Sequence, residues 1–92
     1  MELDKIRERI DKVDEQLLPL FLERMELAAQ AGSYKASHGL PVRNRSREEQ
    51  ILERISERAG ELAPYACKMY EAIFGLALDY ETALSGSEKD SK

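Results

Sequence analysis

The sequence has few of the residues on which disulfide, metal and nucleophilic chemistry depend. Its 92 residues include one cysteine, Cys67, one histidine, His38, and no tryptophan. A single cysteine cannot form a disulfide within the chain, and no second cysteine or histidine lies at metal-ligand spacing to His38. We therefore expect Cys67 to fill space in the last helix, His38 to be solvated, and the chain to bind no metal.

Long apolar runs and an excess of positive charge are also absent. No apolar run approaches the roughly 20 residues that a membrane-spanning helix needs. Met1 leads directly into a charged segment, without the pattern of a signal peptide. The formal net charge is -4, which disfavours nucleic acid as a partner. We expect a cytoplasmic chain that binds neither a membrane nor nucleic acid.

Apolar residues recur at heptad spacing and predict one long helix from Leu3 to about Ala36. Steps of three and four residues connect Leu3, Ile6, Ile10, Val13, Leu17 and Leu20. This spacing is the seam of a helix that packs against other helices. Pro19 interrupts the seam, but the register continues across it without a slip. We therefore favour one kinked helix over two short ones.

This helix is too long for one chain of 92 residues to cover. About 34 helical residues span roughly 50 Å, whereas a compact chain of this size has a radius of gyration of about 12 Å. We infer that a second copy of the chain covers the remainder.

One stripe of the long helix combines two cations with small residues. Arg24, Ala28, Ala31, Gly32 and Lys35 share a face, and the two cations lie about 16 Å apart along the axis. The space that small side chains leave between cations favours an anionic ligand of modest size. The alternative is close helix packing, with both cations reaching solvent.

Arg7 faces away from this stripe. It precedes Arg24 by 17 residues, which is a rotation of about 260° and a distance of about 25 Å along the axis. If Arg7 and Arg24 both serve a ligand, they serve different copies of the site. Otherwise Arg7 is a solvated cation paired with a neighbouring acid such as Asp11.

A second helix follows the loop around residues 37–41. Its N-cap is either Asn44 or Ser46, and the segment from Ser46 to Glu49 has the pattern of a capping box. Arg47 and Glu48 fall in its first turn, where the pattern alone indicates surface charge. Gly60 should end this helix.

A third helix is predicted from about Pro64 to about Leu84. Ala77 lies on its apolar face, and so does the carboxylate of Glu81, which resists ionisation unless a cation is close. Apolar periodicity ends after Leu84. We expect residues 1–84 to form a helical domain and residues 85–92 a disordered polar tail.

Together these residues resemble the all-helical chorismate mutases. The ordered set that carries the resemblance is Arg7, Ile10-Asp11-Lys12-Val13-Asp14, Leu17, Arg24, Lys35, Pro41-Val42-Arg43 and Arg47-Glu48. The resemblance covers roughly residues 3 to 84. It implies an all-α fold with three helices per chain, one long and two shorter, in an intertwined homodimer. It also implies conversion of chorismate, a dicarboxylate, to prephenate in phenylalanine and tyrosine biosynthesis, without a cofactor.

The resemblance further implies roles for individual residues. Arg24 and Lys35 would lie in the chain's own site, and Arg7 would come from the partner chain. The substrate carboxylates would be bound by Arg7, Arg24 and Arg47. Lys35 would donate to the ether oxygen of the breaking bond, opposite Glu81. Glu48 would accept from the ring hydroxyl, with Asn44 beside it.

Three positions depart from the family's commonest pattern, and three alternatives to the implied function remain. Asn44 stands where aspartate is frequent, Ala77 where serine is frequent, and Glu81 where glutamine is frequent. An isochorismate pyruvate-lyase shares this fold and a similar set of cations. A non-catalytic helical dimer is the second alternative. The third is that the chain is one domain of a longer fusion protein.

Overall fold

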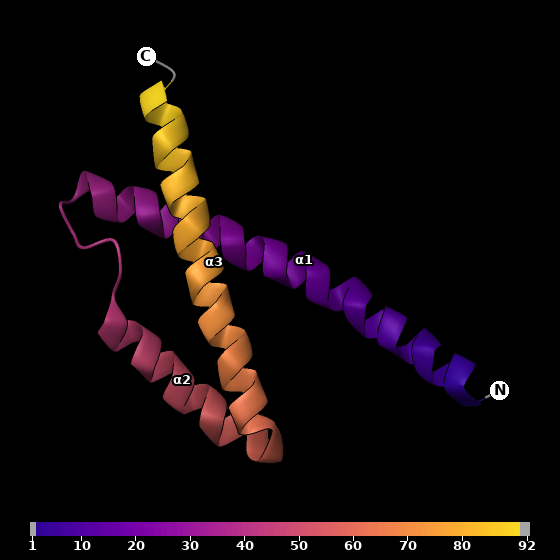
Figure 1. Cartoon of the computed structure of the whole chain (residues 1–92). Coiled ribbons are helices and arrows are strands. Elements are labelled where there is room, and N and C mark those ends of the chain that lie inside the picture. Colours follow the sequence, from indigo (N-terminus) through magenta and orange to yellow (C-terminus); the bar gives the residue numbers. More distant parts are fainter. Residues whose placement is uncertain (1, 91–92) are drawn as a thin grey trace.

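The computed structural model describes residues 2–90, and the side chains of residues 2–84 among them. The elements in chain order are α1 (Glu2–Ser37), α2 (Arg45–Ala59), the short 3₁₀ helix η1 (Gly60–Leu62) and α3 (Ala63–Asp90) (Figure 1). No strand occurs in this described part of the chain. The all-helical fold expected from the sequence is confirmed.

α1 continues through Pro19 without a break. The apolar residues keep their heptad register on both sides of the proline, and the one backbone hydrogen bond that proline removes does not end the helix. The prediction of one helix over this segment, instead of two short ones, is confirmed, and its ends differ from the expected ends by one residue each.

Asn44 is the N-cap of α2. Its side-chain Oδ1 accepts a hydrogen bond from the backbone N–H of Arg47 at 3.0 Å. The capping box predicted at Ser46 is wrong, because the helix already begins at Arg45 and Ser46 lies within its first turn. At the other end, Gly60 has a φ of 59°, a left-handed conformation that glycine adopts without steric cost.

α3 begins at Ala63, with Pro64 in its first turn, as the sequence predicts within one residue. Its helical backbone runs to Asp90, six residues beyond the expected end at Leu84. The side chains of residues 85–90, and residues 91 and 92 entirely, lie outside the described residues. The division at residue 84 into a domain and a polar tail therefore stays a prediction.

α3 packs against both α1 and α2, while the N-terminal half of α1 extends away from the other helices (Figure 1). The radius of gyration is 16.8 Å, compared with about 12 Å for a compact chain of this length. Among the side chains of residues 2–84, only Ile51, Phe74 and Ala77 are buried, each 8% exposed. The open shape follows from a helix that its own chain covers along only part of its length.

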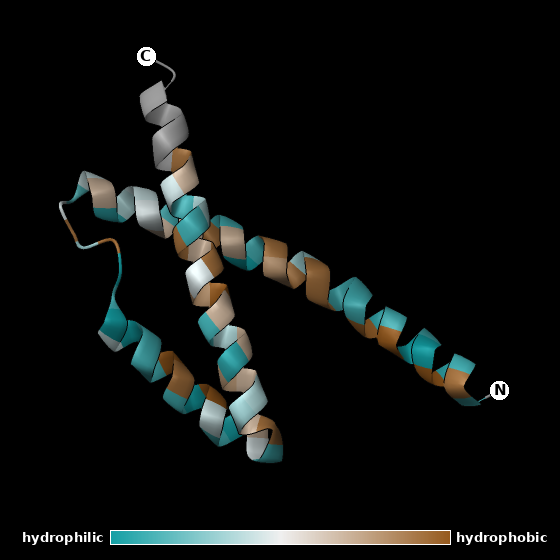
Figure 2. Ribbon diagram, viewed as in Figure 1, coloured by the Kyte–Doolittle hydropathy of each residue, from teal (hydrophilic) through white to brown (hydrophobic). Residues whose placement is uncertain are grey.

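The apolar seam of α1 remains exposed in the single chain. Between 46% and 62% of the surface of each residue is accessible at Leu3, Ile6, Ile10, Val13, Leu17 and Leu20. Figure 2 shows brown, hydrophobic segments recurring along the projecting half of α1. Within residues 2–90, no helix combines the length and apolar character that crossing a bilayer requires.

The cap at Asn44 gives a stability prediction. Asn44→Ala should lower the free energy of unfolding by about 1 kcal/mol, because one N–H of the first turn loses its acceptor. Ser46→Ala, the matched control, should change it by less than about 0.5 kcal/mol. Urea unfolding followed by circular dichroism at fixed protein concentration measures both values. Equal losses in the two variants would contradict the assignment of the cap to Asn44.

Candidate functional site

A cavity of about 370 Å³ lies between α1, the start of α2 and α3. It is open to solvent on one side and falls in the size range of small-molecule sites, about 300–1,000 Å³. Its lining includes four cations, Arg24, Lys35, Arg43 and Arg47, and two carboxylates, Glu48 and Glu81. With both acids ionised, these six side chains carry two net positive charges, which favours a ligand with negative charge.

Seven of the eight residues singled out from the sequence line this cavity: Arg24, Lys35, Asn44, Arg47, Glu48, Ala77 and Glu81. The eighth, Arg7, does not. It lies on the projecting, exposed half of α1, about 25 Å from Arg24 along the helix axis. No motion within α1 brings Arg7 to its own chain's cavity, since both residues belong to one continuous helix.

Arg24 lies against two aromatic rings of α3. Its guanidinium carbon is 5.8 Å from the ring centroid of Tyr70 and 5.6 Å from that of Phe74. These distances are in the range of cation–π attraction, and Phe74 is one of the buried core residues. The aromatic faces explain why a cation is tolerated on the packing seam, and they restrict where its guanidinium can lie.

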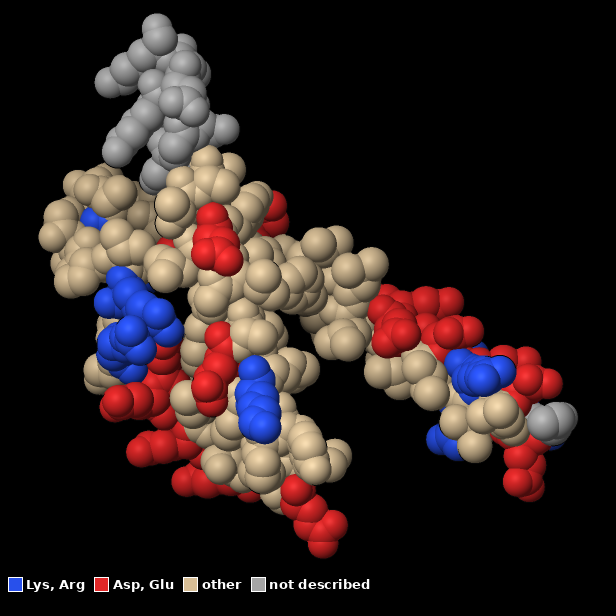
Figure 3. All heavy atoms as spheres, in the orientation of Figure 1, with Lys and Arg blue, Asp and Glu red and all other residues tan. Residues whose placement is uncertain are grey.

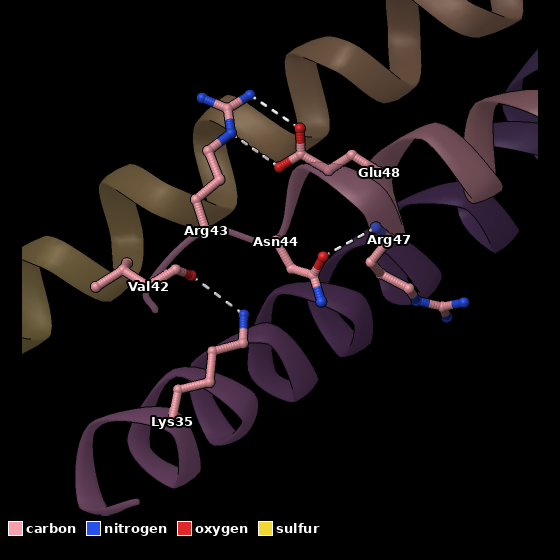
Figure 4. A network of polar contacts seen from close by, with 6 residues as sticks. All are labelled: Lys35, Val42, Arg43, Asn44, Arg47 and Glu48. Atoms are coloured by element: carbon pink, nitrogen blue, oxygen red, sulfur yellow. Dashed lines mark hydrogen bonds and ion pairs between the residues drawn. The ribbon is translucent and has the colours of Figure 1, made fainter. Parts of the chain in front are cut away.

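Lys35 connects α1 to the loop before α2. Its Nζ donates a hydrogen bond to the backbone oxygen of Val42 at 3.2 Å (Figure 4). An ammonium group has three N–H donors, so two remain for a ligand. This contact brings the loop to the edge of the cavity and holds the Lys35 side chain there, half-buried.

Arg43 and Glu48 form a bidentate ion pair at the start of α2. Arg43 Nε donates to Glu48 Oε2 at 2.9 Å and Arg43 Nη2 donates to Glu48 Oε1 at 3.0 Å (Figure 4). The hydrogen bond to Glu48 raises the pKa of Arg43 above its ordinary value. The guanidinium of Arg47 points away from this pair in Figure 4, so Arg47 remains available to a ligand.

Glu81 reaches the cavity across a glycine of α1. A Cβ placed on Gly32 would lie 3.0 Å from both Cγ and Cδ of Glu81, closer than side-chain carbons pack. The absence of a side chain at Gly32 is what lets Glu81 fold over α1 at this point. Ala77, one turn earlier on α3, is buried and lines the same cavity.

Positive and negative side chains are distributed unevenly along α2, which begins at the cavity. Figure 3 shows Lys and Arg atoms gathered where α2 begins, whereas Asp and Glu atoms follow the rest of α2. Local positive charge therefore exists on a chain whose net charge is -4. A small anion would meet the positive end of this distribution at the cavity.

The residues with conventional nucleophilic or metal chemistry lie elsewhere. His38 stacks on Tyr34 with ring centroids 3.9 Å apart, and Cys67 Sγ lies 3.8 Å from the backbone oxygen of Leu52. Neither His38 nor Cys67 lines the cavity. Among the described side chains, no cluster of three or more His, Cys, Asp or Glu could hold a metal ion. The cavity can bind, orient and electrostatically stabilise an anion.

Sequence reasoning gave no role to three residues that shape this cavity. Arg43 enters the sequence pattern only within Pro41-Val42-Arg43, and its partner Glu48 lies five residues away, across a loop with no fixed period. Phe74 has no signal in the sequence beyond its apolar character, and Gly32 has none beyond its place in a stripe of small residues. The spacing of Arg24 from aromatic positions on another helix cannot be read along the chain.

Comparison with known proteins gives a consistent assignment. The sequence matches the chorismate mutase type II family over residues 6–82. The bifunctional chorismate mutase/prephenate dehydratase of Aquifex aeolicus is 41% identical over 54 residues, which are 59% of this chain and 15% of that protein. The corresponding bifunctional protein of Escherichia coli K12 is 46% identical over 50 residues, 54% of this chain and 13% of that protein.

A third relative is the chorismate mutase of Methanocaldococcus jannaschii, 35% identical over 60 residues, which are 65% of this chain and 61% of that protein. The chain thus spans less than two thirds of the length of each of these relatives. The family match, in contrast, covers most of the chain and all the residues that line the cavity. The chain belongs to the chorismate mutase type II family, an isomerase family.

Proposed function

We propose that this chain catalyses the rearrangement of chorismate to prephenate. The observation that carries the proposal is the cavity in which Arg24, Lys35 and Arg47 converge with Glu48, with two net positive charges among its ionisable side chains. Chorismate carries two carboxylates, and their negative charge suits a cavity with an excess of cations. Family membership supports the same substrate.

The proposed reaction needs the chemistry that this cavity offers. It is a one-step pericyclic rearrangement in which the ether C–O bond breaks while a C–C bond forms, with no proton transfer and no external electron donor. The protein has to hold a flexible dianion in its compact, reactive conformer and stabilise negative charge that develops on the ether oxygen. A rate gain of at least about 10⁶, equivalent to about 8 kcal/mol, would place it in the usual enzyme range.

Each lining residue has a role that its chemistry allows. Arg24 and Arg47 suit the two carboxylates, because a guanidinium fork matches a carboxylate bidentately. Lys35 donates to the ether oxygen, and Glu48 accepts from the ring hydroxyl. Ala77 has no side-chain donor, so the contact that a serine would supply there is missing. The Asn44 side chain caps α2 and lines the same cavity as Glu48.

We further propose that two chains form an intertwined homodimer, with three helices from each chain, in which Arg7 of one chain completes the site of the other. The exposed seam of α1 and the open side of the cavity support this arrangement. Arg7 lies on the same projecting half of α1 as the exposed apolar residues. A partner that covers these residues would bring its own Arg7 with it.

Subunit exchange tests the shared site. Arg7→Ala and Lys35→Ala chains should each be nearly inactive, and mixing them under mild denaturation should restore activity, because each heterodimer contains one intact site. Chorismate consumption measures the recovery, and sedimentation measures the association state. A compact folded monomer at micromolar concentration, or no recovery after verified exchange, would contradict the proposal.

Lys35→Ala should lower kcat by about 10²–10³, the usual loss for one donor to a developing oxyanion. Arg24→Ala should cost at least as much, because Arg24 also positions the substrate. His38→Ala and Cys67→Ala are the controls and should leave kcat/KM nearly unchanged. Prephenate appearance is the measurement. Pyruvate release from isochorismate, assayed in parallel, distinguishes a lyase of the same fold.

Glu81→Gln tests the role of the Glu81 side chain beside the ether oxygen. An amide offers a hydrogen-bond donor and carries no negative charge, whereas alanine offers no donor. Glu81→Gln should therefore retain or raise kcat/KM, and Glu81→Ala should lower it. Prephenate appearance measures both variants, and equal kcat/KM in the two would contradict a donor role at this position.

A further inference from the structure

Arg43 uses both donors of one guanidinium edge on both oxygens of Glu48, at 2.9 Å and 3.0 Å. Parallel double hydrogen bonds fix the plane of a carboxylate as well as its position. Each oxygen of Glu48 retains a further lone pair, so the pair still accepts a hydrogen bond from a ligand. The side chain of Glu48 is 19% exposed and that of Arg43 is 35% exposed, which places Glu48 nearer the interior.

An ionised carboxylate at the position of Glu48 disfavours binding of an anionic ligand unless a cation neutralises it. An unpaired Glu48 would repel a dianionic ligand, and it could also bind the cations that the ligand needs. Arg24, Lys35 and Arg47 are the other cations that line the same cavity. Arg43 removes both problems, because it occupies Glu48 with a cation that has no other ion-pair partner among the described side chains.

The loop before α2 holds Arg43 in the required place. Val42, immediately before it, is bonded through its backbone oxygen to Lys35, and Asn44, immediately after it, caps α2. Arg43 is thus anchored on both sides, and Glu48 lies in the first turn of the helix that Asn44 caps. The orientation of Glu48 follows from this local arrangement and needs no contact from α3.

We propose that Arg43 is a positioning residue that holds Glu48 as the acceptor for the ring hydroxyl of the substrate and keeps Glu48 off the carboxylate-binding cations. This inference rests on the proposed function of the same site. It assigns selectivity for a hydroxyl-bearing dicarboxylate to the Arg43–Glu48 pair as a unit, instead of to Glu48 alone.

A double-mutant cycle on the full chain tests the coupling. Arg43→Gln should lower kcat/KM about tenfold, and Arg43→Lys should lose less, because an ammonium still neutralises Glu48 but cannot make the double contact. In a Glu48→Gln background, Arg43→Gln should cost less than about twofold. Arg45→Gln removes a neighbouring charge outside the cavity lining and should leave kcat/KM unchanged. Additive losses in the double variant would overturn the proposal.

A substrate analogue separates positioning from a structural effect. With the dianionic analogue that carries hydrogen in place of the ring hydroxyl, Arg43→Gln should lose clearly less kcat/KM than with chorismate, because the hydroxyl contact is absent and only the effect of a released Glu48 on the cations remains. An equal tenfold loss with chorismate and with the analogue would overturn the proposal, since Arg43 would then support the site in general. Circular dichroism checks that each variant is folded.

The same measurements distinguish failure of this inference from failure of the proposed function. If the native chain neither converts chorismate nor binds it in a calorimetric titration, the proposed function fails and this inference fails with it. If the native chain is active and Arg43→Gln equals it with chorismate, only the role of Arg43 is overturned.

Discussion

The length of α1 is the constraint on which the rest of this structure depends. The helix runs from Glu2 to Ser37, and only its C-terminal half meets α3. One continuous element therefore carries a half that belongs to the chain's own cavity, with Arg24 and Lys35, and a half whose apolar seam none of the described residues covers. Among the described side chains only three are buried, a small core for the several kcal/mol of a stable domain. In the proposed dimer, stability and activity would depend on the same event, burial of the projecting half of α1 by a second copy.

The cavity shows how cations can be kept on a packing face without collapse of the site. Arg24 lies over the rings of Tyr70 and Phe74, so its guanidinium has attractive neighbours that do not neutralise it. Glu48, the acid that could neutralise the cavity's cations, is instead bound to Arg43. Small residues such as Ala28, Ala31 and Ala77 line the cavity and leave its volume open. Donors held in place before the ligand arrives need no reorganisation during a reaction, which is the basis of electrostatic stabilisation by enzymes.

The departures from the commonest family pattern fit this arrangement. Ala77 is buried, where an unpaired hydroxyl would cost free energy unless a ligand or water bonded to it. Glu81 packs over Gly32 at close range and lines the cavity. Asn44 retains the capping function that an aspartate would also perform. Each of these three residues is compatible with the local fold. In the proposed function, each departure would therefore affect at most one contact with the ligand and would leave the shape of the cavity unchanged.

Local periodicity determined much of this protein from the sequence alone. Helices form from regular spacing, so the extent of α1, the passage of the helix through Pro19 and the stop at Gly60 could be predicted, and helical rotation separated Arg7 from Arg24. The choice of Asn44 over Ser46 as N-cap could not be made, because both are good caps and the loop conformation decides which one precedes the first turn. The contacts of Arg24 with Phe74, of Glu81 with Gly32 and of Arg43 with Glu48 depend on helix crossing and loop geometry. These have no period along the chain, and so only the tertiary structure decided them.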